Sequence, residues 1–181
     1  MKGYCAMNRC RSSVFSRILF PAIVLLLTGA SPLQAKEEQW NVCSTPKTQY
    51  VLHIPASLIP SPASPATGCA FQTPDGEFSV EAVVQPDAGE QGQTLEGRMQ
   101  KEKDLLAGTV KYKKKGDSWF ILAGVTPDGT EYYRKLFSKG SEWVTLRITY
   151  PHTQHKKYDK WVTHIEKTFT PFLESKETGA Q

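Results

Sequence analysis

The sequence predicts an α+β domain: an antiparallel sheet of about six strands with two helices packed on one face. Short apolar segments follow one another with turn sequences between them, which is the pattern of successive antiparallel strands. The two helical segments stand apart and do not alternate with strands. A doubly wound parallel sheet is therefore not expected.

The first half of the chain contains three expected strands and one loop. Residues 50–54 alternate as a short strand, and four prolines in residues 55–65 then exclude a helix or a central strand. We interpret this segment as a stiff connector, with a proline-rich ligand for a partner as the alternative. Residues 69–73 and 77–84 flank the turn sequence Thr73-Pro74-Asp75-Gly76 and predict a β-hairpin.

A first helix is expected to begin after Thr94, whose hydroxyl can cap it, and to end before Gly108. The side chains that recur at helical spacing in this segment are Leu95, Met99, Glu102 and Leu106.

Four strand candidates follow. Residues 109–113 are rich in lysine, as an exposed edge strand often is, whereas residues 119–125 are apolar on both faces and predict a covered strand. The turn sequence Thr-Pro-Asp-Gly recurs at residues 126–129 and leads into residues 131–137. Residues 143–150 alternate strictly, which predicts an antiparallel strand with one buried face.

The last element is a strongly amphipathic helix that Pro171 ends. Its apolar stripe recurs at intervals of three and four residues and consists of Tyr158, Trp161, Val162, Ile165 and Phe169.

Residues 1–35 have the organisation of a cleavable signal peptide. Four basic and no acidic residues precede an apolar run, residues 18–27, and small residues continue to Ala35. The run is shorter than the roughly 20 residues of a membrane span. We predict cleavage after Ala35, with Ala30 as the weaker alternative, and translation from Met1 or Met7. A single domain, residues 36–173, and a flexible tail, residues 174–181, would follow.

Removal of the signal changes the meaning of the charge. Four of the 22 basic residues lie in it, which leaves 18 basic and 18 acidic residues in the mature chain. The excess of positive charge that would suggest nucleic-acid binding is thereby lost. We expect no nucleic-acid partner, and contact with a membrane only during export.

The cysteines divide in the same way. Cys5 and Cys10 leave with the signal, and Cys43 and Cys69 remain as one pair. Because disulfides persist outside the cytoplasm, we predict a disulfide between them, with two free buried thiols as the alternative. Residues 36–45, polar apart from Trp40 and Val42, are expected to be a tail that this bond holds.

The mature sequence contains no nucleophile elbow, P-loop, dinucleotide-binding glycine fingerprint or zinc-protease helix. His152, His155 and His164 are weak candidates for zinc or copper ligands. Solvated histidines are the simpler interpretation. We predict no cofactor and no catalytic residue.

Three further groups of residues are weaker candidates for sites. The lysine run around Tyr112 is Lys111, Lys113, Lys114 and Lys115, and a solvated edge is its simplest interpretation. Asp75 and Asp128 occupy equivalent turns, and turn chemistry explains both. Tyr132 and Tyr133 must lie on opposite faces of their strand, so an exposed aromatic patch for a partner is conceivable.

Several short motifs carry a resemblance: Phe71-x-Thr73-Pro74-Asp75-Gly76, Ser118-Trp119-Phe120, Ala123-Gly124, Tyr133-x-Lys135, Tyr150-Pro151 and Tyr158-Asp159. With them the mature chain resembles an uncharacterised group of small exported proteobacterial proteins. The order of its elements resembles the PsbP and Mog1 type of fold. This resemblance implies a role in binding or assembly more often than catalysis.

We therefore expect a periplasmic or secreted, non-enzymatic domain that binds a protein partner or an envelope component. A small metal-binding protein or hydrolase using the three C-terminal histidines is the alternative. A third interpretation is an immunity or inhibitor protein.

Overall fold

The computed structural model describes residues 38–44, 50–86 and 94–173. The expected signal peptide with its cleavage site and the expected C-terminal tail lie outside these residues. Residues Glu37–Gln181 group as one unit.

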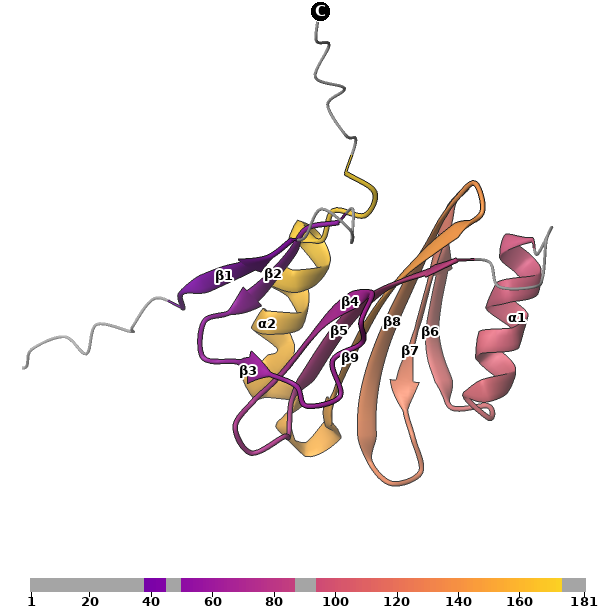
Figure 1. Ribbon diagram of the computed structural model, residues 1–181. Coiled ribbons are helices and arrows are strands. Elements are labelled where there is room, and N and C mark those ends of the chain that lie inside the picture. Colours follow the sequence, from indigo (N-terminus) through magenta and orange to yellow (C-terminus); the bar gives the residue numbers. More distant parts are fainter. Residues whose placement is uncertain (1–37, 45–49, 87–93, 174–181) are drawn as a thin grey trace, which may run out of the picture. The chain divides into compact units, whose positions relative to one another are not determined.

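A seven-stranded sheet, antiparallel throughout, forms the centre of this unit (Figure 1). Its spatial order is β3 (Ile59–Pro60), β4 (Gly68–Gln72), β5 (Ser79–Pro86), β9 (Glu142–Pro151), β8 (Thr130–Lys139), β7 (Trp119–Val125) and β6 (Val110–Lys115). Strands β1 (Trp40–Cys43) and β2 (Leu52–Pro55) form a separate two-stranded sheet. The helices are α1 (Leu95–Leu105) and α2 (His155–Thr168), and the short 3-10 helix His152–Gln154 precedes α2. The predicted α+β class is confirmed.

The two helices cover opposite faces of the sheet, which differs from the expected arrangement on one face (Figure 1). Side chains alternate along a strand, so Leu136 of β8 faces α1 whereas Phe137 faces α2. Strand β7 explains why both faces are covered: Phe120 and Leu122 are buried on one face and Ile121 on the other. A strand that is apolar on both sides needs cover on both sides.

Two hydrophobic clusters result. Under α2 and the β1–β2 sheet, the fully buried side chains include Tyr50, Leu52, Phe78, Val80, Val144, Leu146, Ile148, Tyr158 and Ile165. Under α1, the cluster is Leu106, Phe120, Leu122, Tyr132, Leu136 and Trp143, with Leu95 and Met99 packed against it. The predicted apolar stripes of both helices are therefore the surfaces that each helix buries.

Local signals set the ends of α1. The Thr94 hydroxyl accepts a hydrogen bond from the backbone N–H of Gly97 at 3.0 Å, as expected of an N-cap residue. Gly108 has a φ of +78°, a conformation that glycine adopts at little cost, and the chain then turns into β6.

The expected tail at residues 36–45 is partly a strand. β1 pairs with β2 in antiparallel register, with Trp40 opposite Pro55 and Cys43 opposite Leu52. The sequence hides this strand, because Asn41 and Val42 are exposed and only Trp40 and Cys43 are partly buried. Cys43 and Cys69 lie at disulfide distance, with a Cα–Cα separation of 6.6 Å.

Candidate functional site

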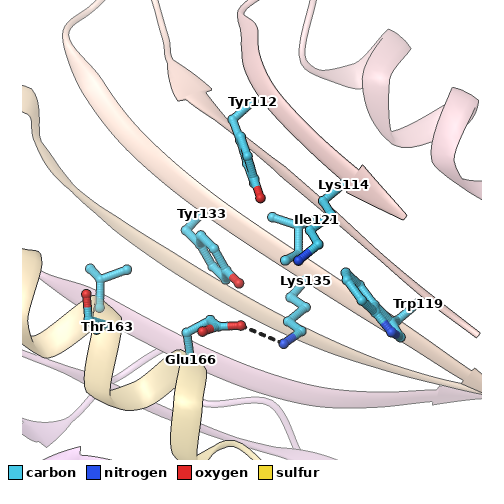
Figure 2. A pocket seen from close by; sticks show the side chains of 9 residues that line it. Tyr112, Lys114, Trp119, Ile121, Tyr133, Lys135, Thr163 and Glu166 are labelled. Carbon is cyan, nitrogen blue, oxygen red and sulfur yellow. Dashed lines mark hydrogen bonds and ion pairs between the residues drawn. The ribbon is translucent and has the colours of Figure 1, made fainter. Parts of the chain in front are cut away.

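A pocket lies beside α2, on the part of the sheet face that the helix does not cover (Figure 2). Its volume is about 400 Å³. Strands β6, β7 and β8 and the side of α2 supply its lining: Tyr112, Lys114, Trp119, Ile121, Tyr133, Lys135, Val162, Thr163 and Glu166. We call this the aromatic–lysine pocket.

Two rows of side chains that cross the strands build the pocket. Ala123 of β7 is in register with Tyr112 of β6 and Tyr133 of β8. Two residues along β7, Ile121 is in register with Lys114 and Lys135. The tyrosines and lysines are the long members of each row, and the β7 residues between them are shorter. The space above β7 is therefore open. Figure 2 shows the polar ends of Tyr112, Tyr133 and Lys114 turned toward it, whereas the Lys135 ammonium group is turned toward Glu166.

Trp119 closes one end of the pocket between two ammonium groups. Lys114 Nζ lies 5.8 Å and Lys135 Nζ 5.4 Å from the centroid of its ring, within the range of cation–π contacts. The indole also packs against the backbone of Gly116, where an added Cβ would lie 2.6 Å from Trp119 Cε2. A side chain at position 116 would therefore displace the indole.

An ion pair joins β8 to α2 at the wall of the pocket. Lys135 Nζ lies 2.8 Å from Glu166 Oε1, as the dashed line in Figure 2 shows. The Lys135 side chain is 13% exposed, and its ammonium group lies 5.1 Å from the centroid of the Phe137 ring. Contacts on several sides thus fix the position of this lysine.

The hydroxyl group of Tyr133 is buried and has no hydrogen-bond partner among the described residues. Burial raises the pKa of Tyr133 far above its ordinary value, and the negative charge of Glu166 raises it further. The group is therefore a neutral donor at physiological pH. By contrast, Tyr112 is 51% exposed and forms the outer edge of the pocket.

Two of the three histidines proposed as metal ligands, His152 and His155, meet at the N-terminal end of α2. His152 Nδ1 and His155 Nδ1 each lie 2.9 Å from a carboxylate oxygen of Glu131, and the Tyr150 hydroxyl donates to the same carboxylate at 2.9 Å. Burial raises the pKa of Glu131, but the hydrogen bonds from His152 and Tyr150 and the charge of His155 outweigh it, so the pKa is lowered. Within the described part of the chain, no group of three or more His, Cys, Asp or Glu side chains is placed to hold a metal ion.

His164 lies apart from that pair. Nine residues of helix separate it from His155, which corresponds to about 13 Å along the axis. Its ring stacks on Trp40 of β1 with centroids 3.6 Å apart, and the His53 ring lies 6.2 Å away. The three histidines therefore do not converge on one site.

The two turn aspartates have local partners. The Thr73 hydroxyl donates to Asp75, and the Thr130 hydroxyl donates to Asp128 at 2.9 Å. The hydrogen bond from Thr73 lowers the pKa of Asp75, and hydrogen bonds from the side chains of Thr126 and Thr130 lower the pKa of Asp128. Each aspartate therefore serves its own turn, and the two do not form a catalytic pair.

The lysine run divides between the two faces of the edge strand β6. Lys114 lines the pocket, whereas Lys115 on the other face forms an ion pair with Glu96 of α1. The sequence contains a signal for this division: Tyr-x-Lys occurs at residues 112–114 and again at residues 133–135. With period-two alternation, each motif places its tyrosine and lysine on one face. What the sequence does not show is that a single strand separates the two motifs.

The lining offers both hydrogen-bond donors and an acceptor. Its donors are two ammonium groups and the hydroxyls of Tyr112, Tyr133 and Thr163, and its charged acceptor is Glu166. A molecule in the pocket can therefore meet polar groups from β6, β8 and α2.

No protein-family model matches the chain, and no curated protein matches it in sequence. Within the described residues, none of the helices has the length and apolarity that crossing a membrane requires. Among solved structures, the chain is similar to a cyanobacterial PsbP (CyanoP) from Synechocystis, with a TM-score of 0.53 and 10% identity over 77% of this chain and 96% of that one. It is also similar to PA94 from Pseudomonas aeruginosa, of unknown function, with a TM-score of 0.43 and 8% identity over 74% and 97% of the two chains. The chain thus has a PsbP-like fold.

Proposed function

We propose that the mature chain is an exported, non-enzymatic domain that binds a protein partner or another component of the cell envelope, and that it binds through the aromatic–lysine pocket. The observation that carries this proposal is the open half of the α2 face. Two lysines, a glutamate and a tyrosine hydroxyl without a hydrogen bond gather there beside aromatic rings, whereas the rest of that face is filled by the mostly apolar side chains of the hydrophobic cluster.

Energetics support a binding role for these residues. A buried hydroxyl without a partner costs free energy, commonly about 1–3 kcal/mol, unless a ligand satisfies it. Aromatic side chains that are partly exposed beside cations are typical of recognition surfaces. Tyr112 lies on the edge strand β6, is 51% exposed and belongs to neither hydrophobic cluster.

The disulfide pair supports export. Cys43 of β1 and Cys69 of β4 are 26 residues apart in sequence and meet at bonding distance. Disulfides of this structural kind are common in exported proteins and rare in the cytosol. The basic and then apolar N-terminal segment gives the same indication independently.

Site-directed photo-crosslinking in the native envelope tests the proposal. A benzophenone amino acid replaces Tyr112 in one variant and Lys113 in its matched control, because these neighbours point to opposite faces of β6. We expect a discrete crosslinked species from position 112 and none from position 113. Equal crosslinking from both positions, or from 113 alone, would exclude the pocket as the binding surface. An intact N-terminus in cytosolic material, read by mass spectrometry, would overturn the exported location.

A further inference from the structure

We infer that the aromatic–lysine pocket takes a small organic anion: one negatively charged group carried on a ring-sized apolar body. This inference rests on the proposed binding role of the pocket and names the chemistry of its ligand.

The charges of the lining leave one cation for a ligand. Glu166 is already paired with Lys135 at 2.8 Å. Lys114 forms no ion pair within the described residues, and the contact that it makes is with the Trp119 ring. An anionic group beside Lys114 would therefore complete the charge balance of the pocket, whereas a cation would meet an ammonium group without a counter-ion.

The neutral donors indicate where the anion lies. The hydroxyl of Tyr133 makes no hydrogen bond of ordinary geometry with the described residues, although the Glu166 carboxylate lies near enough to raise its pKa. Figure 2 shows this hydroxyl turned toward the same space as Lys114 and the Tyr112 hydroxyl. Oxygen atoms of a carboxylate, sulfonate or phosphate can accept from several donors at once. A single anionic group between β6 and β8 can thus satisfy groups from both strands.

The rest of the pocket suits an apolar body of limited size. Trp119 and Val162 provide apolar surface, and Ile121 forms a floor that is only 5% exposed. A volume of about 400 Å³ lies near the lower end of the range of small-molecule sites, roughly 300–1,000 Å³. A body of up to three aromatic rings fits such a space. A polyanion would carry more charge than one unpaired lysine can balance.

Two fluorescent probes with the same ring system test the inference. 8-Anilinonaphthalene-1-sulfonate carries one negative charge, and N-phenyl-1-naphthylamine is its uncharged counterpart. We expect the folded mature domain to bind the sulfonate more tightly than the neutral probe, with an affinity that falls as NaCl is added. Near-ultraviolet circular dichroism confirms that each variant retains its tertiary structure, because the sulfonate also binds partly unfolded chains.

Matched variants locate the binding. Lys114→Met is expected to weaken sulfonate binding about fivefold, since a charge-assisted contact is worth on the order of 1 kcal/mol or more at a partly exposed site. Lys113→Met, on the opposite face of the same strand, is expected to change it by less than about twofold. Tyr133→Phe removes the unpartnered donor and is expected to weaken sulfonate binding while leaving the neutral probe unaffected.

The outcomes separate this inference from the proposed function. Equal affinity for the two probes, equal effects of the two lysine variants, or no binding by the folded domain would overturn the assignment of an organic anion. If crosslinking from position 112 persists in that case, the pocket still binds a partner and only the ligand class is excluded. Loss of both signals would overturn both proposals.

Discussion

The hydroxyl group of Tyr50 donates a hydrogen bond to the carbonyl oxygen of Ala82 at 2.6 Å. The same hydroxyl accepts from the backbone N–H of Cys69 at 2.9 Å, so it joins β4 and β5 from above the sheet. Tyr50 is fully buried, and burial raises its pKa to about 12, which keeps the hydroxyl protonated at neutral pH.

Tyr50→Phe is therefore expected to destabilise the domain by about 1–3 kcal/mol, because it leaves a buried carbonyl and a buried N–H without their partner. Urea unfolding at neutral pH measures the change. Tyr158→Phe is the matched control: Tyr158 is equally buried, but its hydroxyl lies 3.4 Å from Glu77 at the edge of the core. A cost as large for Tyr158→Phe as for Tyr50→Phe would show that the loss of the hydroxyl, and not of this bridge, is responsible.

Glu102 of α1 provides a second test on the opposite face. Its side chain is 3% exposed and lies 2.9 Å from Arg134 of β8 and 3.3 Å from Arg98. Glu102→Gln would leave two guanidinium groups facing each other without a counter-charge, so we expect a loss of about 2 kcal/mol in the free energy of unfolding. Glu96 lies on the same helix as Glu102 but forms an exposed ion pair, with Lys115 of β6. Glu96→Gln should therefore leave the unfolding midpoint nearly unchanged. Equal midpoints for the two variants would contradict the importance of burial.

The disulfide predicts a redox dependence of stability. Joining Cys43 to Cys69 closes a loop across a sequence separation of 26 residues, which the chain-entropy model values at about 3 kcal/mol. The double variant Cys43→Ser, Cys69→Ser should therefore unfold at lower urea concentration than the oxidised wild type, and its β1 amides should exchange hydrogen faster. Added reductant should destabilise the wild type and leave the variant unchanged. A wild type that is insensitive to reductant would show that the two thiols are not bonded in solution.

His164 predicts the direction of a pH effect. Burial lowers the pKa of His164 below 6.5, and the nearby His53 lowers it further. The unfolded chain then binds more protons at this residue than the folded chain, so its contribution to stability is present above pH 6.5 and is lost as the pH falls through that value toward the lowered pKa.

His164→Phe keeps an aromatic ring against Trp40 but cannot titrate. Its unfolding midpoint should fall less between pH 7.5 and pH 5.5 than that of the wild type. An NMR titration of the His164 ring reports the pKa directly, and a midpoint at or above 6.5 would exclude this explanation. His155→Phe, at the other end of α2, serves as the comparison for a histidine in a different environment.

Much of the fold could be predicted because period and turn chemistry are local properties. β7 occupies the residues 119–125 that were expected, Thr94 caps α1, and the stripe from Tyr158 to Phe169 lies against the core. The expected edge position of the lysine-rich strand is also confirmed. Each of these features is set by residues that lie close together in the sequence, within a single helix or strand and the turn beside it.

The rest depends on contacts between distant segments. β1 is a strand because β2 pairs with it, and the sequence of Trp40–Cys43 gives no sign of that partner. Likewise, Ile59 and Pro60 pair with β4 inside a segment whose prolines predict only a loop. The path of the chain from one side of the sheet to the other decides which face each helix covers. Alternation within a single strand does not reveal that path.

The candidate site was missed for the same reason. In the sequence, Tyr112 and Lys114 belong to a lysine run whose simplest interpretation is a solvated edge. Alternation shows of Tyr133 only that it opposes Tyr132. The order of β6, β7 and β8 in the sheet is what places the two Tyr-x-Lys motifs on either side of the same floor.

Strand β8 carries two independent tasks in adjacent residues. Arg134 holds the buried carboxylate of α1, while Lys135 belongs to the pocket on the reverse side. Because neighbouring side chains point in opposite directions, substitutions at positions 133 and 135 can reshape the pocket without disturbing the anchor of α1 at 134. An insertion of one residue in this strand would exchange the two sides at once. Substitutions should thus be tolerated here far better than length changes.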